Sequence, residues 1–238
     1  MSEVIELGDL SITVTRKNIR NVHLSVHPPE GRVTLAAPTS TRLEVVRAYV
    51  ISRLGWIRAQ RDKLSNQARE APRQFIERES HYLWGRRYLM SVAYRDGRPG
   101  VLLDHRRILL TVRPGSDAAR RAEVVHDGQK GLLHQVVPPV IKAWERRLKV
   151  EVKDYFLQRM KTRWGSCNPA AGHIRLNTEL VKKPRDLLEY VIVHEMTHLI
   201  EHTHSERFIQ LMDQNYPTWR EARAELNDLP LTAEAWNG

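Results

Sequence analysis

The sequence predicts an α+β protein in two parts, a strand-rich N-terminal region and a C-terminal region built around one functional helix. Residues 4–37 contain stretches that alternate apolar and polar side chains, as half-buried strands do. Residues 184–198 instead place apolar side chains at helical spacing. Charge also divides the chain, because residues 1–116 hold 20 Lys and Arg against 11 Asp and Glu, whereas residues 117–238 hold 18 against 17. We therefore expect domains at 1–116 and 117–238.

Composition excludes several classes of protein. The 238 residues are 41% hydrophobic and 28% charged. This composition is typical of a globular chain and not of a disordered or fibrous one. No apolar run approaches the ~20 residues that a membrane-spanning helix needs, and the N-terminus lacks the basic and apolar stretches of a secretion signal. The single cysteine, Cys167, cannot form an intramolecular disulfide. We expect a cytoplasmic protein without a membrane partner.

The N-terminal region is expected to begin with short strands and one long helix. Val22–Val26 alternates apolar and polar residues, and the Pro-Pro-Glu-Gly turn at 28–31 precedes a strand at Val33–Ala37. Ser40 or Thr41 can cap a helix that runs to about Ser65. Its buried stripe has helical periodicity and consists of Leu43, Val46, Val50, Leu54 and Ile57.

A polar linker at 66–74 separates this helix from a second group of strands. These are predicted at Tyr82–Val92, Val101–Leu103 and Ile108–Val112, with no evident internal repeat. The net charge of +9 on residues 1–116 indicates an acidic partner such as nucleic acid, and arginines flank the helical stripe at positions 42, 47, 53, 58 and 61. The same arginines can simply keep that face solvated, so both interpretations stay open.

The C-terminal region starts with a helical pattern from Asp117 to about Leu148. His126-Asp127-Gly128 and Pro138-Pro139 are expected to break or kink it. Strands follow at Tyr155–Met160 and His173–Asn177. Pro184 then suits the first position of the next helix, whose buried face contains Leu187, Leu188, Val191 and Ile192.

That helix carries the sequence His194-Glu195-Met196-Thr197-His198. Two histidines four residues apart project from one helical face and can bind one zinc ion, while the glutamate beside the first histidine can act as a general base on the water that attacks the substrate. A catalytic zinc site normally has three protein ligands and one open position. The pattern therefore predicts a hydrolytic zinc centre with one ligand still to be found.

His204 is the best candidate for the third ligand. His202 would lie about 12 Å along an unbroken helix from His194, too far for the rings to converge easily. Two further residues let the helix end and the chain turn back, and Ser205 can cap a following helix. Glu206 and Glu221 are weaker candidates.

These residues resemble the signature of the YgjP-like metallopeptidases, which are related to the SprT-like and minimal zincin proteases. The resemblance rests on the histidine motif, His204-Ser205 with Phe208, Arg163-Trp164-Gly165-Ser166-Cys167, Ile174-Arg175-Leu176-Asn177, and Tyr216-Pro217 with Trp219. It covers about residues 140–225. It implies a zincin-like catalytic domain with a small mixed sheet, zinc on His194, His198 and His204, Glu195 as catalytic base, and hydrolysis of peptide bonds. It does not identify a physiological substrate.

Three other residues are candidates for substrate contact. Asn177 can line the cleft if the strand at 174–177 offers its edge to an extended peptide. Arg175 has a structural or substrate-orienting role, and Tyr216 either packs or stabilises an oxyanion. Arg163–Cys167 is expected to form a tight turn that packs Trp164 beneath the active helix, with direct catalytic contact as the alternative, and Cys167 is expected to be a small buried residue.

Two other functions remain open. The chain can be a nucleic-acid-associated binding protein with a non-catalytic metal site, although a structural zinc site usually completes four protein ligands, often cysteines. It can also be a zinc amidase that acts on a small molecule. The sequence indicates neither the oligomeric state nor whether the site is latent.

Overall fold

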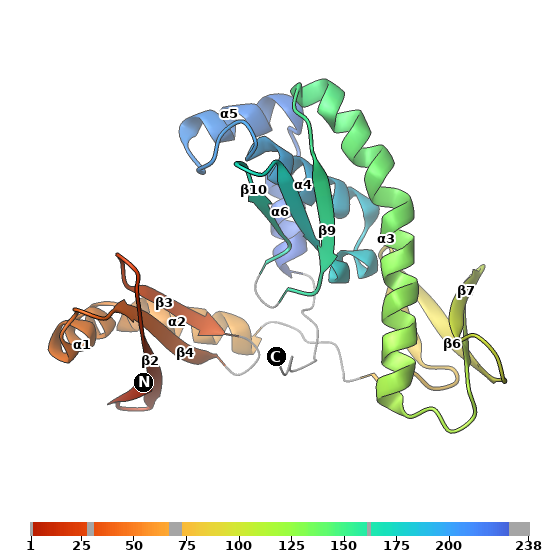
Figure 1. The fold of residues 1–238 in the computed structure, drawn as a ribbon, viewed down its shortest axis with the longest axis horizontal. Helices are drawn as coiled ribbons and strands as arrows, with labels where there is room; N and C mark the ends of the chain where they lie inside the picture. Colours follow the sequence, from red (N-terminus) through yellow and green to blue (C-terminus); the bar gives the residue numbers. More distant parts are fainter. Residues whose placement is uncertain (1, 28–30, 67–72, 161–162, 229–238) are drawn as a thin grey trace. The chain divides into compact units, whose positions relative to one another are not determined.

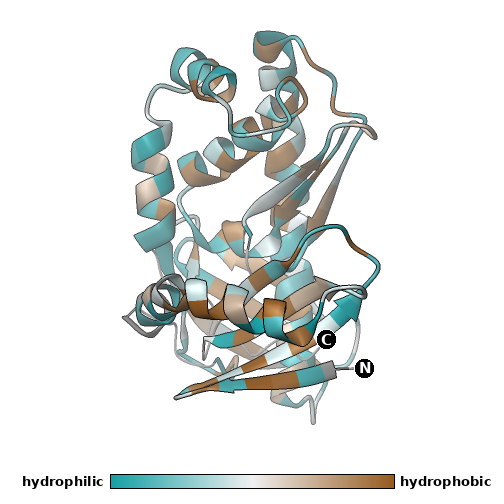
Figure 2. Ribbon diagram, turned by 90° about the vertical axis from the view of Figure 1, so that its left-hand side faces the viewer, coloured by the Kyte–Doolittle hydropathy of each residue, from teal (hydrophilic) through white to brown (hydrophobic). Residues whose placement is uncertain are grey.

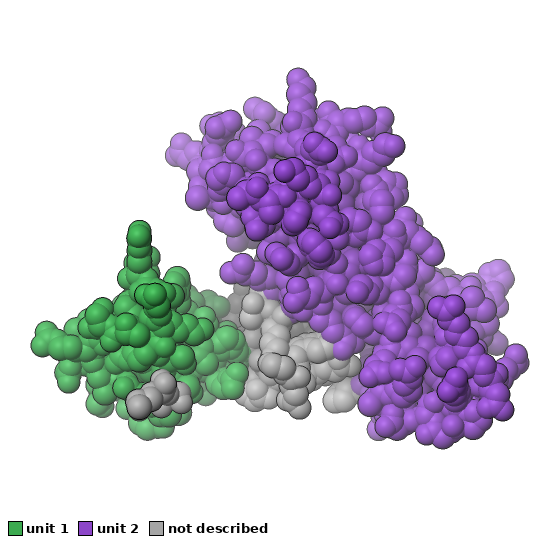
Figure 3. Space-filling view, viewed as in Figure 1, with its two compact units in different colours: residues 1–70, 230–238 green, residues 71–229 purple. Residues whose placement is uncertain are grey.

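The computed structural model describes residues 2–27, 31–66, 73–160 and 163–228. Within them the chain forms two compact units, one up to residue 66 and one from residue 73 to 228 (Figure 3). This division differs from the predicted boundary after residue 116. The reason is that the strands between residues 80 and 112 pack against the long helix that follows them, so both belong to one core.

Unit 1 is a four-stranded sheet with two helices. The strand order is β1-β2-β4-β3, and the central pair, β2 and β4, is parallel while the outer pairs are antiparallel. Alternate side chains along the strands point into the core. In β2 these are the buried Leu10, Ile12 and Val14. The strands are β1 Ser2–Leu7, β2 Leu10–Lys17, β3 His23–His27 and β4 Arg32–Pro38.

The predicted single helix is two helices in the structure. These are α1 Leu43–Ser52 and α2 Leu54–Asn66, and the C-cap Arg53 separates them. Neither Ser40 nor Thr41 is the N-cap, which is Arg42 without a side-chain hydrogen bond. Most of the predicted stripe packs on the sheet, because Val46, Val50 and Ile57 are fully buried and Leu54 packs partly against them, whereas Leu43 is exposed.

Unit 2 begins with a second four-stranded sheet, in the order β5-β6-β8-β7. Its central pair, β6 and β8, is again parallel. The predicted strand at Tyr82–Val92 is a hairpin, in which Trp84 and Gly85 form the turn with positive φ. The strands are β5 Ser80–Leu83, β6 Arg86–Tyr94, β7 Gly100–Asp104 and β8 Arg107–Val112.

A single helix, α3 Ala118–Leu148, connects this sheet to the rest of the unit (Figure 1). The Asp117 side chain accepts a hydrogen bond from the Arg120 backbone N–H and so caps the helix. The helix runs unbroken through both predicted breakpoints and contains Pro138 and Pro139. Gly128 lets it approach β7 closely, because a Cβ atom there would lie 2.8 Å from the Val101 side chain.

The last layer of unit 2 is a three-stranded sheet with three α-helices and one 3₁₀ helix. The strand order is β10-β11-β9, with β11 antiparallel to β10 and parallel to β9. The elements are β9 Asp154–Gln158, β10 Gly165–Asn168, β11 His173–Asn177, η1 Thr178–Lys182, α4 Arg185–Thr197, α5 Glu206–Asn215 and α6 Trp219–Asp228. The α+β class predicted from the sequence is thus confirmed.

Hydrophobic and hydrophilic residues share most helices and strands (Figure 2), as expected of elements with one face on a core. Unit 2 has one continuous core that runs from β8 through α3 to α4 and α5. Among the described residues no helix has the length and apolarity to cross a membrane.

Candidate metal centre and cleft

Helix α4 places the first two histidines. Pro184 is its N-cap, one position before the predicted one, and the helix buries almost every side chain from Leu187 to Thr197. His194 lies in the last turn, and His198 is the C-cap residue. Both therefore project from the end of an otherwise buried helix. Packing positions this end firmly, because Thr197 is fully buried and donates its hydroxyl hydrogen bond to the Val193 carbonyl.

The chain then reverses and returns His204 to the same point. The Glu201 backbone N–H still donates to the Thr197 carbonyl, and the Glu201 carboxylate accepts from the Thr203 hydroxyl and backbone N–H. Ser205 is the N-cap of α5, as its spacing predicts, with its hydroxyl accepting from the Phe208 backbone N–H. The end of α4, the turn at residues 201–203 and the N-cap of α5 at Ser205 together bring His204 beside α4.

The three predicted ligands converge. One nitrogen from each of His194, His198 and His204 lies within 4.8 Å of the other two, and the Nε2 atoms of His194 and His204 are 3.1 Å apart. The His198 Nδ1 atom lies 3.0 Å from the Glu201 carbonyl, which holds that ring and leaves its Nε2 free to bind a cation. His202 is outside the cluster, with its Nδ1 3.1 Å from the His198 carbonyl.

The electrostatics of the cluster suit a metal. Burial, together with the nearby His198 and His204, lowers the pKa of His194 to about 3. Burial also lowers the pKa of His198. The imidazoles of His194 and His198 are therefore neutral at pH 7, the form that binds metals. Phe208 packs within 5.0 Å of all three rings, and the buried Nδ1 of His194 has no hydrogen-bond partner among the described residues. This donor set fits zinc, which prefers such nitrogens.

Glu195 lies beside the cluster with its carboxyl group against β10. The residue is only 6% exposed, and a Cβ atom on Gly165 would come within 2.5 Å of its Oε1. Glycine is thus required there for space. Burial raises the pKa of Glu195 to about 8, and the positive charge of Arg163 opposes that rise. Such a carboxyl group exchanges protons near neutral pH.

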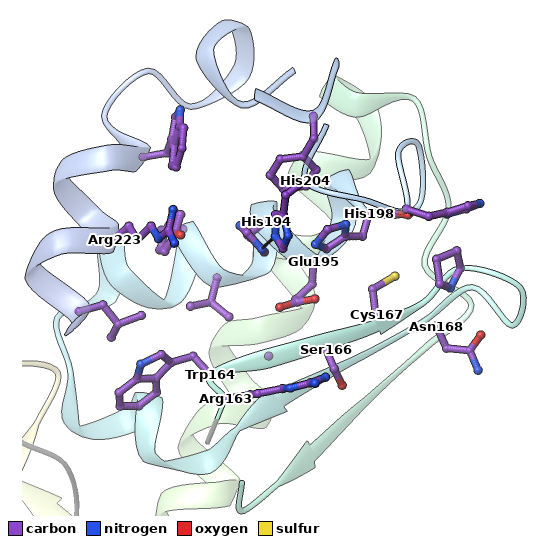
Figure 4. Close-up of a pocket in the computed structure, with 18 of the residues that line it drawn as sticks. Arg163, Trp164, Ser166, Cys167, Asn168, His194, Glu195, His198, His204 and Arg223 are labelled. Atoms are coloured by element: carbon purple, nitrogen blue, oxygen red, sulfur yellow. Dashed lines mark hydrogen bonds between the residues drawn. The ribbon is translucent and has the colours of Figure 1, made fainter. Parts of the chain in front are cut away.

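A cleft of about 1120 Å³ opens over these residues (Figure 4). Helices α4, α5 and α6 line it on one side and residues 163–170 on the other. Half of the latter stretch, Gly165–Asn168, is β10, a strand instead of the predicted turn, and it is the edge of its sheet. β11, whose edge was predicted to be open, is paired on both sides. Cys167 is half-buried in this wall, and burial raises its pKa to about 11, so its thiol stays protonated.

The three residues predicted to contact substrate do not line the cleft. Asn177 is buried and donates to the carbonyls of Met160 and Arg163, which fixes the segment before β10. Arg175 lies over the ring of Phe156. The Tyr216 hydroxyl donates to the Asp186 carbonyl at the start of α4, and burial raises the pKa of Tyr216 to about 12. All three side chains therefore contact other parts of the protein and do not face the cleft.

Several residues that line the cleft are not predicted from the sequence. Tyr190 packs edge-on to His194, and its position four residues before that histidine could have predicted this face. Arg223 and Trp219 come from α6, which turns back over α4. No local pattern distinguishes Arg223 from Arg220, the other arginine of that helix, so only the fold reveals it.

Comparison with known families decides the relationship. The profile described as "YgjP-like, metallopeptidase domain" matches residues 20–229. The chain belongs to the YgjP-like family. The resemblance inferred from the histidine motif is confirmed, and the match extends well beyond the predicted 140–225 into unit 1. As a YgjP-like protein the chain is a metallopeptidase by family.

Two solved structures are similar to parts of the YgjP-like chain. The metallopeptidase zymogen of Pyrococcus abyssi abylysin is 18% identical, with 38% of this chain and 91% of that chain covered and a TM-score of 0.36. The zymogen of Methanocaldococcus jannaschii jannalysin is 20% identical, with 37% and 90% covered and a TM-score of 0.34. A search of curated proteins gives no match.

Proposed function

We propose that this YgjP-like protein is a zinc-dependent peptidase, with zinc on His194, His198 and His204 and Glu195 as general base. The observation that carries the proposal is the convergence of three imidazoles beside one buried carboxyl group. Zinc bound there would polarise the scissile carbonyl and make a water molecule acidic enough to attack near pH 7.

Glu195 supplies the proton transfers. Its carboxylate accepts a proton from the attacking water and passes it to the departing amine nitrogen. A raised pKa makes the carboxylate a stronger base for the first step, and because that pKa is near neutral, the protonated group can still act as the acid in the second. Gly165 supports this role by leaving space for the carboxyl group beside β10.

The open edge of β10 is the proposed track for an extended peptide. Backbone groups of an edge strand are unpaired on one side, so a peptide can add to the sheet there. Residues 163–170 form one wall of the cleft, which places such a peptide across from His194 and His198. An edge strand that faces the helix of His194 supports the zincin-like arrangement implied by the resemblance, with β10 in the role that was predicted for residues 174–177.

The test is metal analysis with a casein-cleavage assay of Glu195→Ala. We expect about one zinc per chain in both proteins, because Glu195 is not a ligand, and a fall in turnover of at least about 100-fold in the variant, as expected for loss of a general base. Glu225→Ala, an exposed change on α6, is the matched control. Wild-type turnover by Glu195→Ala would refute the mechanism, and loss of zinc would make Glu195 a ligand.

The interaction with nucleic acid stays a prediction. The surplus positive charge is shared by both sheets, because residues 1–70 hold 11 Lys and Arg against 7 acids and residues 71–116 hold 9 against 4. Titration of the whole protein with DNA and RNA at two salt concentrations tests it, and absence of binding at low salt would remove it.

A further inference from the structure

Two arginines lie on opposing walls of the cleft. Arg223 projects from α6 on the side of His194, and Arg163 precedes β10 on the side of Glu195 (Figure 4). Both are close enough to act electrostatically, because Arg223 contributes to the lowered pKa of His194 and Arg163 opposes the raised pKa of Glu195. Both side chains belong to exposed residues and can reach a bound peptide.

Among the residues that the structure describes, neither guanidinium has an acidic partner. No hydrogen bond or ion pair joins either group to another side chain in the described part of the chain, and Glu195 is the only acidic residue that lines the cleft. Arg220, one turn earlier on α6, differs, because its guanidinium is paired with both oxygens of Asp213. Helix α6 therefore has one arginine tied to the protein and one turned to the cleft.

The cleft that Arg223 lines has many apolar side chains. Aromatic and aliphatic residues contribute to its walls from α4, from α6 and from the residue before β10: Trp164, Tyr190, Val191, Trp219 and Leu226. A guanidinium beside such walls binds a carboxylate more strongly than one in open water, because less solvent screens the pair. An aliphatic stem with a terminal carboxylate complements both features.

We propose that Arg223 is a specificity-determining residue that selects peptides with a carboxylate close to the scissile bond. The carboxylate belongs to an Asp or Glu side chain or to the peptide's C-terminus. The inference rests on the proposed function in that both concern one cleft. Arg163 is the less specific cation of the pair, since it lies beside the general base and influences every substrate alike.

A binding experiment tests this without catalysis. The zinc-loaded Glu195→Gln protein is titrated by fluorescence anisotropy with pools of random peptides that differ only in a central Glu or Gln and in a free or amidated C-terminus. We expect about fivefold tighter binding of one carboxylate pool, the size of a single partly exposed ion pair, and a preference that weakens with salt. The comparison of Glu with Gln pools tests for a side-chain carboxylate, and the comparison of free with amidated C-termini tests for the terminal one.

Variants assign the preference to Arg223. In the Glu195→Gln background, Arg223→Gln should abolish it, Arg223→Lys should retain part of it, and Arg220→Gln, the same change one turn away, should leave it intact. A thermal melt checks that each variant is folded. Equal binding of all pools by the parent, or an unchanged preference in Arg223→Gln, would overturn the proposal.

Digestion of a denatured proteome separates this inference from the proposed function. Wild-type cleavage sites should be enriched in Asp or Glu at one position, or lie close to a C-terminus, and Arg223→Gln should lose that bias. Cleavage without any such bias overturns the role of Arg223. If no peptide is cleaved but the binding preference holds and depends on Arg223, peptidase activity fails and the inference about Arg223 stands.

Discussion

The two four-stranded sheets have the same topology. Each places the first strand at one edge, pairs the second and fourth strands in parallel at the centre, and ends with the third strand at the other edge. Leu35 in β4 and Leu110 in β8 occupy equivalent positions by register, and both are buried. The sequence shows no evident repeat, so the repetition lies in the burial pattern and strand order.

The sheets differ in the helices that cover them. Val46, Val50 and Ile57 of the short helices α1 and α2 close the core of unit 1 locally. Helix α3 instead covers β7 and β8 and continues to α4, where Trp144 donates its indole N–H to the Glu189 carboxylate. Two sheets of the same topology thus have different roles. The sheet of unit 1 forms a compact unit with its own helices, whereas the sheet of unit 2 packs through α3 against the layer that carries the candidate metal centre.

Fragments cut at two positions give the largest expected effect. A chain of residues 73–238 should keep a cooperative melt and bind zinc, because it retains the whole core of unit 2. A chain of 117–238 should not fold, since α3 would lose the sheet that covers Val124, Val125 and Leu133. Circular dichroism melts and zinc titration measure both. A folded 117–238 fragment with full zinc affinity would restore the boundary at residue 116.

The metal centre should stabilise only one of the two sheets. His204→Ala should lower zinc affinity by at least about 100-fold, whereas His202→Ala should change it little, because only His204 reaches the cluster. Competition with a chelator measures both affinities. Zinc should raise the melting temperature of unit 2 alone. A larger loss with His202→Ala would mean a different ligand set.

Equivalent leucines compare the sheets directly. Leu35→Ala and Leu110→Ala should each lower the free energy of unfolding of their own unit by about 2–5 kcal/mol, through lost burial and a cavity. Only Leu110→Ala should weaken zinc retention on heating. Differential scanning calorimetry with zinc release resolves the two transitions. Equal loss of zinc in both variants would show that the sheets are energetically coupled.

The smallest effect is a pH dependence confined to unit 2. Without metal, the Glu195 carboxyl group has its pKa raised from 4.5 to about 8, so the stability it contributes is full below pH 4.5 and is lost as pH rises to about 8. Glu195→Gln removes this loss. As pH rises from 5 to 8, the melting temperature of metal-free Glu195→Gln should therefore increase relative to that of the metal-free wild type. A constant difference across that range would contradict the raised pKa.

The sequence predicted the parts of the site that depend on local spacing. His194 and His198 follow from helical periodicity, and His204 follows from where a helix must end for the chain to return. It did not predict the cleft wall, because the burial of Asn177 and the edge position of β10 depend on strand pairing across the fold. The short strand at Gly165–Asn168 has too few apolar residues to be recognised, and the break at Arg53 interrupts a continuous apolar pattern.

The shared strand order also determines how these sheets are exposed during synthesis. β4 and β8 are each the last strand of their sheet to be made, and each belongs at its centre. Until they emerge from the ribosome, β2 and β3, and later β6 and β7, present unpaired edges toward an empty central position. Such edges are prone to pair with other chains. Each sheet closes only when its final strand inserts, so the interval between the emergence of β3 and of β4, and later between that of β7 and of β8, is the time of greatest aggregation risk.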